Sequence, residues 1–255
     1  MNQFSELAAL IDPAAMLVCA KMQPDPWQAG VLRSASRRHL LLCSRQCGKS
    51  TVTAALALHT VLYHPASLVL LLSPSLRQSK ELFRSVMMLY ERIRGTTSPE
   101  VESTLVMELA NGSRIAALPG KEETIRGFAG VSLLVIDEAA RVSDVLYQAV
   151  RPMLAVTAGR MICLSTPWGK RGFFYECWNG GEDWERTRVT APECPRIPKS
   201  FLEEEKRCLP DNVFRQEYMC EFADAEGAVF RADDIEAAFG HDLGPPLFPE
   251  LRNTA

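Results

Sequence analysis

One octapeptide constrains the fold of this chain more than any other feature. It lies between an apolar run at residues 39–43 and an Ala- and Leu-rich segment at residues 52–62. Its members are Ser44, Arg45, Gln46, Cys47, Gly48, Lys49, Ser50 and Thr51. A strand, a tight loop and a helix in this order are the context that a phosphate-binding loop requires. The octapeptide, called the phosphate loop below, therefore predicts an α/β fold with a nucleotide site.

The residues of the phosphate loop suit this chemistry. Backbone N–H groups of such a loop surround the phosphates, and the following helix directs its N-terminus at them. Lys49 is expected to place its ammonium at the β- and γ-phosphates, and the Ser50 hydroxyl to bind Mg²⁺. Ser44 stands where the usual pattern opens with glycine. The alternative interpretation is an ordinary strand-to-helix turn with a solvated lysine.

The rest of the chain alternates between predicted strands and helices. Continuous apolar runs predict buried strands at residues 67–73, 131–138 and 160–165. Helical segments are expected at residues 3–20, 76–94, 144–155, 171–178, 199–208 and 211–221. Asn111 and Gly112 predict a hairpin turn within residues 104–118. This order indicates a mainly parallel sheet with helices on both faces.

Composition narrows the class of protein. The chain has 255 residues and a formal net charge of −3, so a nucleic-acid contact would have to be a local patch. Eight cysteines without a Cys-x-x-Cys pair disfavour a zinc site and indicate a reducing compartment. The N-terminus lacks a basic signal-peptide region, and no apolar run approaches the ~20 residues of a spanning helix. We therefore expect a soluble, intracellular protein.

A second chemical signal lies at the end of the apolar run at residues 131–138. Asp137 and Glu138 close this run, which places them at the end of a buried strand. Ligands of open α/β sheets bind at the carboxyl ends of the strands. There Asp137 is suited to orient Mg²⁺ through its water shell, and Glu138 to polarise the attacking water as a general base. The alternative is that both carboxylates only cap the next helix.

Two arginines and a small hydroxyl motif complete the predicted catalytic set. Arg45, inside the phosphate loop, and Arg126, before the acidic strand, are candidates for neutralising charge on the γ-phosphate. Ser165, Thr166 and Pro167 follow the next strand, where hydroxyl groups can sense the γ-phosphate and pass on its loss. The alternatives are solvated arginines and ordinary strand-to-turn chemistry.

A short predicted helix lies upstream of the phosphate loop. Asp25 is a good N-cap and Pro26 a good first residue, so Trp27 and Gln28 fall in the first turn. An exposed glutamine amide pairs with both N6 and N7 of adenine. Trp27 and Gln28 are therefore candidate adenine contacts. The alternative is a capping residue beside a core tryptophan.

In this order the motifs resemble those of the large terminase subunit of tailed bacteriophages, the motor that packages DNA. The five matching segments are Pro26-Trp27-Gln28 (adenine motif), residues 44–51 (Walker A), Arg126-Gly127 (finger loop), residues 135–140 (Walker B) and Ser165-Thr166-Pro167 (coupling motif). Ser44 in place of glycine is common in this family. The resemblance covers about residues 24–235 and implies a RecA-like P-loop NTPase with a small C-terminal lid.

The resemblance also implies a function and partners. The expected activity is ATP hydrolysis with Mg²⁺ that moves double-stranded viral DNA into a procapsid, in the host cytoplasm. The expected assembly is a homo-oligomeric ring in which Arg126 reaches a neighbour's nucleotide, with the small terminase subunit and the portal protein as partners. We expect an ATPase core over residues 1–180, a lid over 181–239 and a tail or linker over 240–255 toward a nuclease domain. No nuclease activity is expected from this chain.

Two other functions fit parts of the pattern. A superfamily 2 helicase shares the upstream glutamine, the phosphate loop and the acidic strand motif, but it needs a second RecA-like domain. A non-hydrolysing ATP-binding module would need neither Asp137 nor Glu138. Basic residues that could contact DNA are Lys170, Arg171, Lys199, Lys206 and Arg207.

Overall fold

The centre of the fold is one eight-stranded sheet. The computed structural model describes all residues except 1–2, 95–98, 121–124, 126, 181–182 and 224–255. The strand order is β3-β4-β5-β2-β6-β7-β1-β8, and the sheet is parallel from β5 to β8. The strands are β1 (Arg38–Cys43), β2 (Leu68–Ser73), β3 (Val101–Glu102), β4 (Val106–Glu108), β5 (Arg114–Pro119), β6 (Val131–Asp137), β7 (Arg160–Ser165) and β8 (Glu185–Val189). The predicted α/β fold with a mainly parallel sheet is confirmed.

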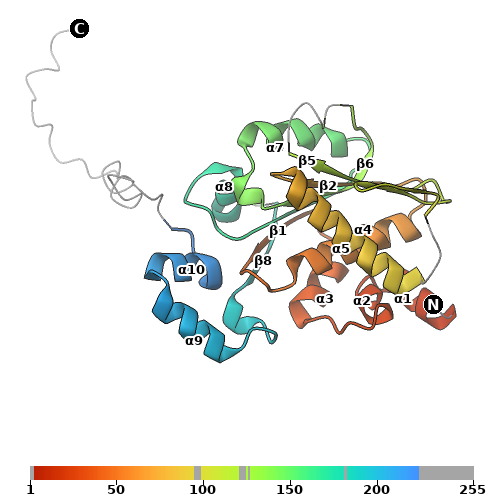
Figure 1. Ribbon diagram of the computed structural model, residues 1–255. Helices are drawn as coiled ribbons and strands as arrows, with labels where there is room; N and C mark the ends of the chain where they lie inside the picture. The colour runs from red at the N-terminus through yellow and green to blue at the C-terminus, as the bar shows by residue number, and fades with distance from the viewer. Residues whose placement is uncertain (1–2, 95–98, 121–124, 126, 181–182, 224–255) are drawn as a thin grey trace, which may run out of the picture.

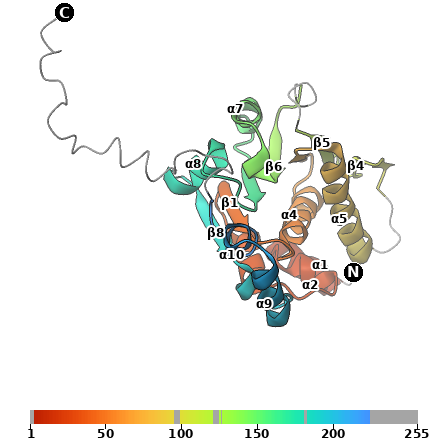
Figure 2. The same ribbon diagram turned by 60° about the vertical axis from the view of Figure 1, so that its left-hand side comes forward.

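Helices cover both faces of this sheet (Figures 1 and 2). One face carries α1 (Gln3–Ile11), α2 (Ala15–Cys19), α3 (Pro26–Arg33), α4 (Lys49–Tyr63) and α5 (Leu76–Arg94). The other carries η1 (Ala139–Arg141), α7 (Asp144–Val150), η2 (Arg151–Leu154) and α8 (Gly172–Gly180). Among the described residues, no helix combines the length and apolarity needed to cross a bilayer.

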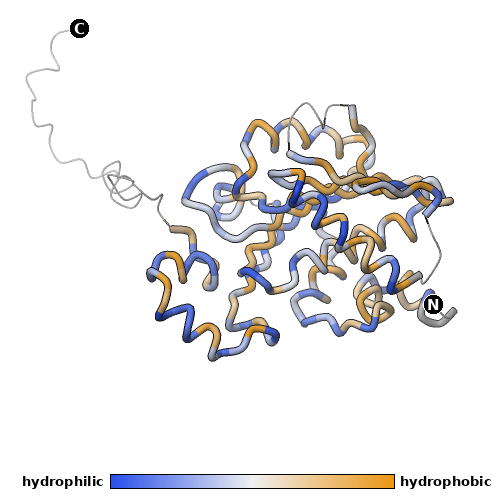
Figure 3. Tube along the Cα trace, viewed as in Figure 1, coloured by the Kyte–Doolittle hydropathy of each residue, from blue (hydrophilic) through white to orange (hydrophobic). Residues whose placement is uncertain are grey.

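The inner strands β1, β2, β6 and β7 are almost wholly buried, which explains the continuous apolar runs in the sequence, and they are mostly orange in Figure 3. In β1, Leu41 and Cys43 pack on the α4 side while Leu40 and Leu42 pack on the α7 side. All four side chains are at most 1% exposed. Full burial of each leucine contributes about 1.5–3 kcal/mol to folding stability. The packing of β1 against both helix layers therefore fixes the position of the phosphate loop that follows it.

Most predicted elements lie where the sequence placed them, with one correction on the α7 side. The predicted helix at residues 144–155 is α-helical only to Val150 and continues as the 3₁₀ turn η2. Pro152 has no N–H to donate, so it interrupts the α-helical hydrogen bonds. The expected hairpin around Asn111 is formed by β4 and β5.

The C-terminal part of the described chain first contributes one more strand to the sheet and then continues beyond the sheet edge. β8 pairs in parallel with β1, so the sheet extends past residue 180, where we expected the core to end. The free edge of β1 supplies the backbone partners that β8 needs. After η3 (Ala191–Glu193), α9 (Lys199–Cys208) and α10 (Asp211–Met219) lie beyond this edge (Figure 1). The predicted tail at residues 240–255 lies outside the described residues.

Candidate active site

Three predicted motifs meet at the carboxyl edge of the sheet. In the pairing register, Leu42 of β1 is opposite Ser165 of β7, and Leu164 is opposite Asp137 of β6. The phosphate loop follows β1 directly, and α4 begins at Lys49. Neighbouring parallel strands therefore bring together the phosphate loop, the acidic pair and the Ser165 motif.

The phosphate loop has a backbone that only some residues adopt. Gly48 is the N-cap of α4 with a φ of 91°, and Gln46 has a φ of 61°. A Cβ atom at Gly48 would lie 2.8 Å from Nε2 of Gln28. Glycine suits this position because other residues rarely adopt its left-handed backbone, and a Cβ atom there would displace the Gln28 amide.

Side chains from two distant segments support the loop from behind. Gln28 Nε2 donates to the Gly48 carbonyl at 3.3 Å, and Gln28 Oε1 accepts from the Asp25 N–H at 2.9 Å. Arg196 donates to the Cys47 carbonyl and forms an ion pair with Asp25 at 2.8 Å. These bonds fix the orientation of the loop carbonyls away from the phosphate side.

The arrangement of Gln28 corrects one sequence expectation. We expected an exposed amide, but Gln28 is only 3% exposed, because it completes a capping box with Asp25 and contacts the loop. Trp27 packs against the hydrophobic core on the α4 side, and its Nε1 is buried without a hydrogen-bond partner in the described structure. Whether Trp27 and Gln28 also contact adenine stays a prediction.

A cleft of about 690 Å³ opens over the phosphate loop. Its lining residues are Arg45, Gln46, Gly48, Lys49, Ser50, Thr51, Gln78, Glu138 and Arg141. Two residues of the loop are instead buried beneath it. Ser44 and Cys47 are both fully buried. The backbone N–H of Ser44 donates to the Val189 carbonyl at 2.9 Å.

Opposite charges are paired across this cleft. Lys49 Nζ lies 3.3 Å from Glu138 Oε1, and Arg141 donates to Glu138 Oε2 at 2.8 Å. Burial lowers the pKa of Lys49, but the carboxylates of Glu138 and Asp137 outweigh it, so the pKa is raised. Lys49 is therefore a fixed cation at the loop, held in place by the acidic strand.

Asp137 is the most perturbed acid of the site. Burial raises its pKa to about 6, against the opposing effect of Lys49, and Glu138 adds to the rise. The Glu138 N–H donates to Asp137 Oδ1 at 2.9 Å. A nearby divalent cation would relieve the cost of ionising this carboxylate. Asp137 together with the cleft-lining Ser50 hydroxyl fits Mg²⁺, which takes few protein ligands and completes its shell with water and phosphate.

Glu138 itself has an unusual backbone. Its φ of 49° places it in the left-handed region, and it is the N-cap of η1. Non-glycine residues there are uncommon and cost free energy, and they cluster at functional sites. This conformation directs the Glu138 side chain between Lys49 and Arg141.

The predicted coupling motif lies at the same edge. Ser165, Thr166 and Pro167 are buried, and the hydroxyls of Ser165 and Thr166 have no partner among the described residues. The next residue, Trp168, is 42% exposed, and the Arg141 guanidinium lies 4.3 Å from its ring centroid. Through Arg141, the loop after β7 is thus in contact with the acidic strand.

The two predicted arginines have different outcomes. Arg45 lines the cleft, and its guanidinium forms an ion pair with Glu217 of α10. Arg126 lies outside the described residues, so its role stays a prediction. Sequence reasoning missed Arg141, Arg196, Glu217 and Gln78. Arg141 could have been predicted, because it lies three positions after Glu138, at the i, i+3 spacing of one helical turn.

Within the described parts of the chain, no cluster of three or more His, Cys, Asp or Glu side chains is arranged to hold a metal ion. A magnesium site of this type does not need one. Its ligands are one hydroxyl, phosphate oxygens and waters, with a carboxylate orienting the waters. The site therefore has the parts of a nucleotide-dependent phosphoryl-transfer centre.

Most of this chain matches a known sequence family. The family described as "Terminase large subunit, T4likevirus-type, N-terminal" matches residues 40–237. The large terminase subunit of Thermus phage G20c is 25% identical over 84% of this chain and 51% of its own length. That of Escherichia phage T5 is 27% identical over 78% of this chain and 47% of its own. The chain spans about half the length of these curated relatives.

Solved structures show the same fold. The ATPase domain of the Thermus phage P74-26 large terminase superposes with a TM-score of 0.71 at 24% identity, over 81% of this chain and 97% of that domain. The HK97 bacteriophage large terminase gives a TM-score of 0.64 at 14% identity, over 79% of this chain and 51% of that protein. The predicted RecA-like architecture is thereby confirmed.

Proposed function

The chain belongs to the terminase large subunit family, and we propose that it hydrolyses ATP to move double-stranded viral DNA into a procapsid. One observation carries the ATPase assignment. Lys49 of the phosphate loop and Glu138 of the acidic strand lie 3.3 Å apart on the wall of one cleft, above Asp137 and beside Ser50. A solvated lysine after an ordinary turn would not be held against two carboxylates in this way.

Each residue of the cleft has a defined task in this proposal. Lys49 and the loop N–H groups would hold the β- and γ-phosphates. Ser50 and Asp137 would hold Mg²⁺, which would neutralise charge on the phosphoryl group. Arg45 is placed to contact phosphate once Glu217 releases it. Glu138 accepts the proton of the attacking water, after Lys49 turns from its carboxylate to the phosphates.

The wider assembly follows from the family rather than from a contact in this structure. We propose a homo-oligomeric ring on duplex DNA in the host cytoplasm, with the small terminase subunit and the portal protein as partners. A ring supplies an arginine in trans, and Arg126 is the proposed finger. Within the predicted lid at residues 181–239, β8 belongs to the sheet. We therefore propose that the part after β8 acts as the lid, and the ion pair between Arg45 and Glu217 supports this by connecting α10 to the loop.

The nucleotide-bound structures of another terminase support ATP as the ligand. The large terminase of bacteriophage D6E has been solved with ADP and with ATP-gamma-S. It shares the fold of this chain at 11–13% identity. At this identity only the fold is shared, so the proposed cleft chemistry depends on Lys49, Asp137 and Glu138 of this chain.

The test is the ATP hydrolysis rate per subunit as a function of protein concentration, with and without duplex DNA. A ring motor predicts a rate that climbs with concentration and that collapses in Arg126→Ala, because the finger comes from a neighbour. Arg84→Ala, at an exposed position of α5, is the matched control. A rate that is independent of concentration and indifferent to Arg126 would leave an ATPase without the proposed ring.

A further inference from the structure

A second cavity lies at the opposite end of β1. Its volume is about 540 Å³. It is lined by Arg37, Arg38, Tyr147, Gln148, Arg151, Pro152, Leu154, Ala155, Ala158, Gly159 and Met161. These come from the starts of β1 and β7 and from the α7–η2 segment. Because β1 rises about 3.3 Å per residue, this amino-edge cavity lies roughly 17 Å from the phosphate loop and is a separate site.

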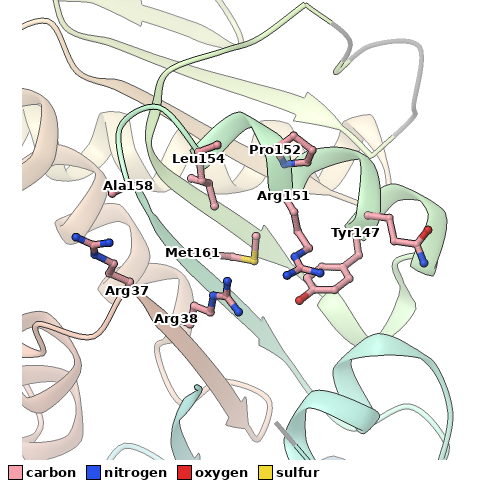
Figure 4. A pocket seen from close by; sticks show the side chains of 11 residues that line it. Arg37, Arg38, Tyr147, Arg151, Pro152, Leu154, Ala158 and Met161 are labelled. Carbon is pink, nitrogen blue, oxygen red and sulfur yellow. The ribbon is translucent and has the colours of Figure 1, made fainter. Parts of the chain in front are cut away.

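The charged residues that line the cavity are all positive. Three arginines line it, and among the described lining residues none is Asp or Glu. Figure 4 shows Arg38 and Arg151 extending from different segments to either side of Met161, with Arg37 farther along near Ala158. Arg38 and Arg151 thus bring positive charges from two elements to one cavity, and this charge favours an anionic ligand.

The arginines have little internal compensation. Arg38 lies 3.9 Å from Asp183, but these side chains are 42% and 84% exposed, so the pair contributes little. The Arg151 guanidinium lies 5.6 Å from the ring centroid of Tyr147. Tyr147 in turn stacks on Phe173 at 4.1 Å. Arg151 thus rests on a fixed aromatic ring with its donors directed to the cavity (Figure 4).

The wall of the cavity is rigid. A Cβ atom at Gly159 would lie 2.2 Å from the Val131 carbonyl, so the turn before β7 packs directly on β6. Thr157 donates its hydroxyl to the same carbonyl, and Gly159 donates its N–H to the Leu154 carbonyl at 3.2 Å. A preformed wall binds a ligand without an ordering cost.

We propose that the amino-edge cavity binds a compact phosphate-bearing ligand. The volume falls in the range of small-molecule sites. Planar guanidinium groups match phosphate oxygens in paired hydrogen bonds. A phosphate monoester carries close to two negative charges, so it suits several guanidiniums better than a single carboxylate does. The ligand is either a free phosphate compound or the terminal phosphate of a DNA strand, because a phosphodiester within a strand carries only one negative charge.

Calorimetric titration with pyrophosphate in the absence of Mg²⁺ tests the site. Lys49→Ala serves as the background, because it weakens phosphate binding at the phosphate loop. We expect the Lys49→Ala protein to bind pyrophosphate at one saturable site. Adding Arg38→Gln and Arg151→Gln should weaken this binding at least about tenfold. Arg77→Gln, an exposed arginine on α5, is the charge-matched control and should change nothing.

Two outcomes would overturn the proposal. One is equal pyrophosphate affinity with and without Arg38 and Arg151. The other is the absence of saturable binding up to about 10 mM. Arg151→Gln alone keeps the test valid if the double substitution impairs folding, since Arg151 is exposed on η2. Binding restored by Arg38→Lys and Arg151→Lys would show that charge rather than fork geometry dominates, and would still support the site.

A second arm separates the two sources of phosphate. Short DNA duplexes with and without a 5′-phosphate are titrated under the same conditions. Tighter binding of the phosphorylated duplex that depends on Arg38 and Arg151 assigns the site to DNA ends. Pyrophosphate binding without this dependence assigns it to free phosphate compounds. Because the phosphate loop is disabled throughout, failure of this proposal would leave the proposed ATPase function untouched.

Discussion

The two ends of β1 carry opposite electrostatic designs. At the carboxyl edge, Lys49 and Arg141 both contact Glu138, so the cations of the nucleotide cleft are neutralised by carboxylates. At the amino edge, Arg38 and Arg151 line a cavity in which no described lining residue is acidic. The same strand therefore connects a site whose charges are balanced internally with one whose charges require a ligand.

This difference separates a catalytic site from a binding site. In the proposed mechanism, the acids at the carboxyl edge would orient Mg²⁺ and accept a proton, and in the nucleotide-free cleft Glu138 is paired with Lys49 and Arg141. The charged side chains that line the amino-edge cavity are all arginines, so it is suited to hold an anion rather than to transform it. Substitutions at the two edges should accordingly affect different measurements.

The largest effect should come from Lys49→Ala. Its ammonium is the fixed cation of the cleft, so its removal should lower kcat/KM for ATP by about 10²–10³-fold. Steady-state hydrolysis measures this, with Lys80→Ala on the exposed side of α5 as control. Turnover close to that of the unmodified chain would mean that the phosphates bind elsewhere.

Asp137 should give the next largest effect, on stability. Its pKa is raised from 3.8 to about 6, so the folded state binds a proton more tightly than the unfolded state. Its contribution to stability therefore falls as pH rises from about 4 to above 6, by up to about 3 kcal/mol. Asp137→Asn lacks this contribution.

Denaturant unfolding at pH 4 and pH 8, without nucleotide, checks the prediction. Asp137→Asn should gain stability relative to the unmodified chain as pH rises across this window. A difference between the two proteins that stays constant with pH would show that Asp137 is not strained by burial. With Mg²⁺ and ATP, turnover needs the ionised Asp137 carboxylate, and a bound cation would lower its pKa, so turnover should fall only at a pH below this region.

A smaller effect is expected from the support behind the phosphate loop. Arg196→Ala removes the donor to the Cys47 carbonyl and the ion pair with Asp25. The loop then loses part of its preorganisation, so KM for ATP should rise about tenfold while kcat changes less. Arg84→Ala, at an exposed position of α5, is the matched control. If kcat falls more than KM rises, Arg196 has a role in the chemical step instead.

The smallest effect sharpens the contrast between the edges. The Arg38→Gln and Arg151→Gln double variant should keep the basal ATP turnover within about twofold, because its residues lie roughly 17 Å from the phosphate loop. Hydrolysis without DNA is the measurement. A large loss of turnover would show that the two edges of the sheet act as one functional unit.

The sequence predicted the parts of the site that lie on strand ends. The phosphate loop, Asp137 and Ser165 each follow an apolar run, and carboxyl ends of parallel strands meet at one edge. Arg196 and Glu217 could not be placed in this way. They are 149 and 172 residues from their partners Cys47 and Arg45, and only the packing of η3 and α10 brings them close.

Two further features were hidden for physical reasons. Gln28 was expected to be exposed, because a capping residue in a first turn usually is, but the tight approach to Gly48 buries it. The amino-edge cavity has no motif, since Arg38 and Arg151 belong to unrelated elements. Only the pairing of β1 beside β7, under α7 and η2, gathers them.

The most direct test of the ATPase assignment compares binding and turnover in Glu138→Gln. Glutamine keeps the size of the side chain and a hydrogen bond to Lys49 but cannot accept the proton of the attacking water. We predict that the variant binds Mg²⁺-ATP with affinity within about threefold of the unmodified chain, and that single-turnover hydrolysis slows by at least about 100-fold. Hydrolysis at the unmodified rate would contradict the role of Glu138 and, with it, this account of the carboxyl edge.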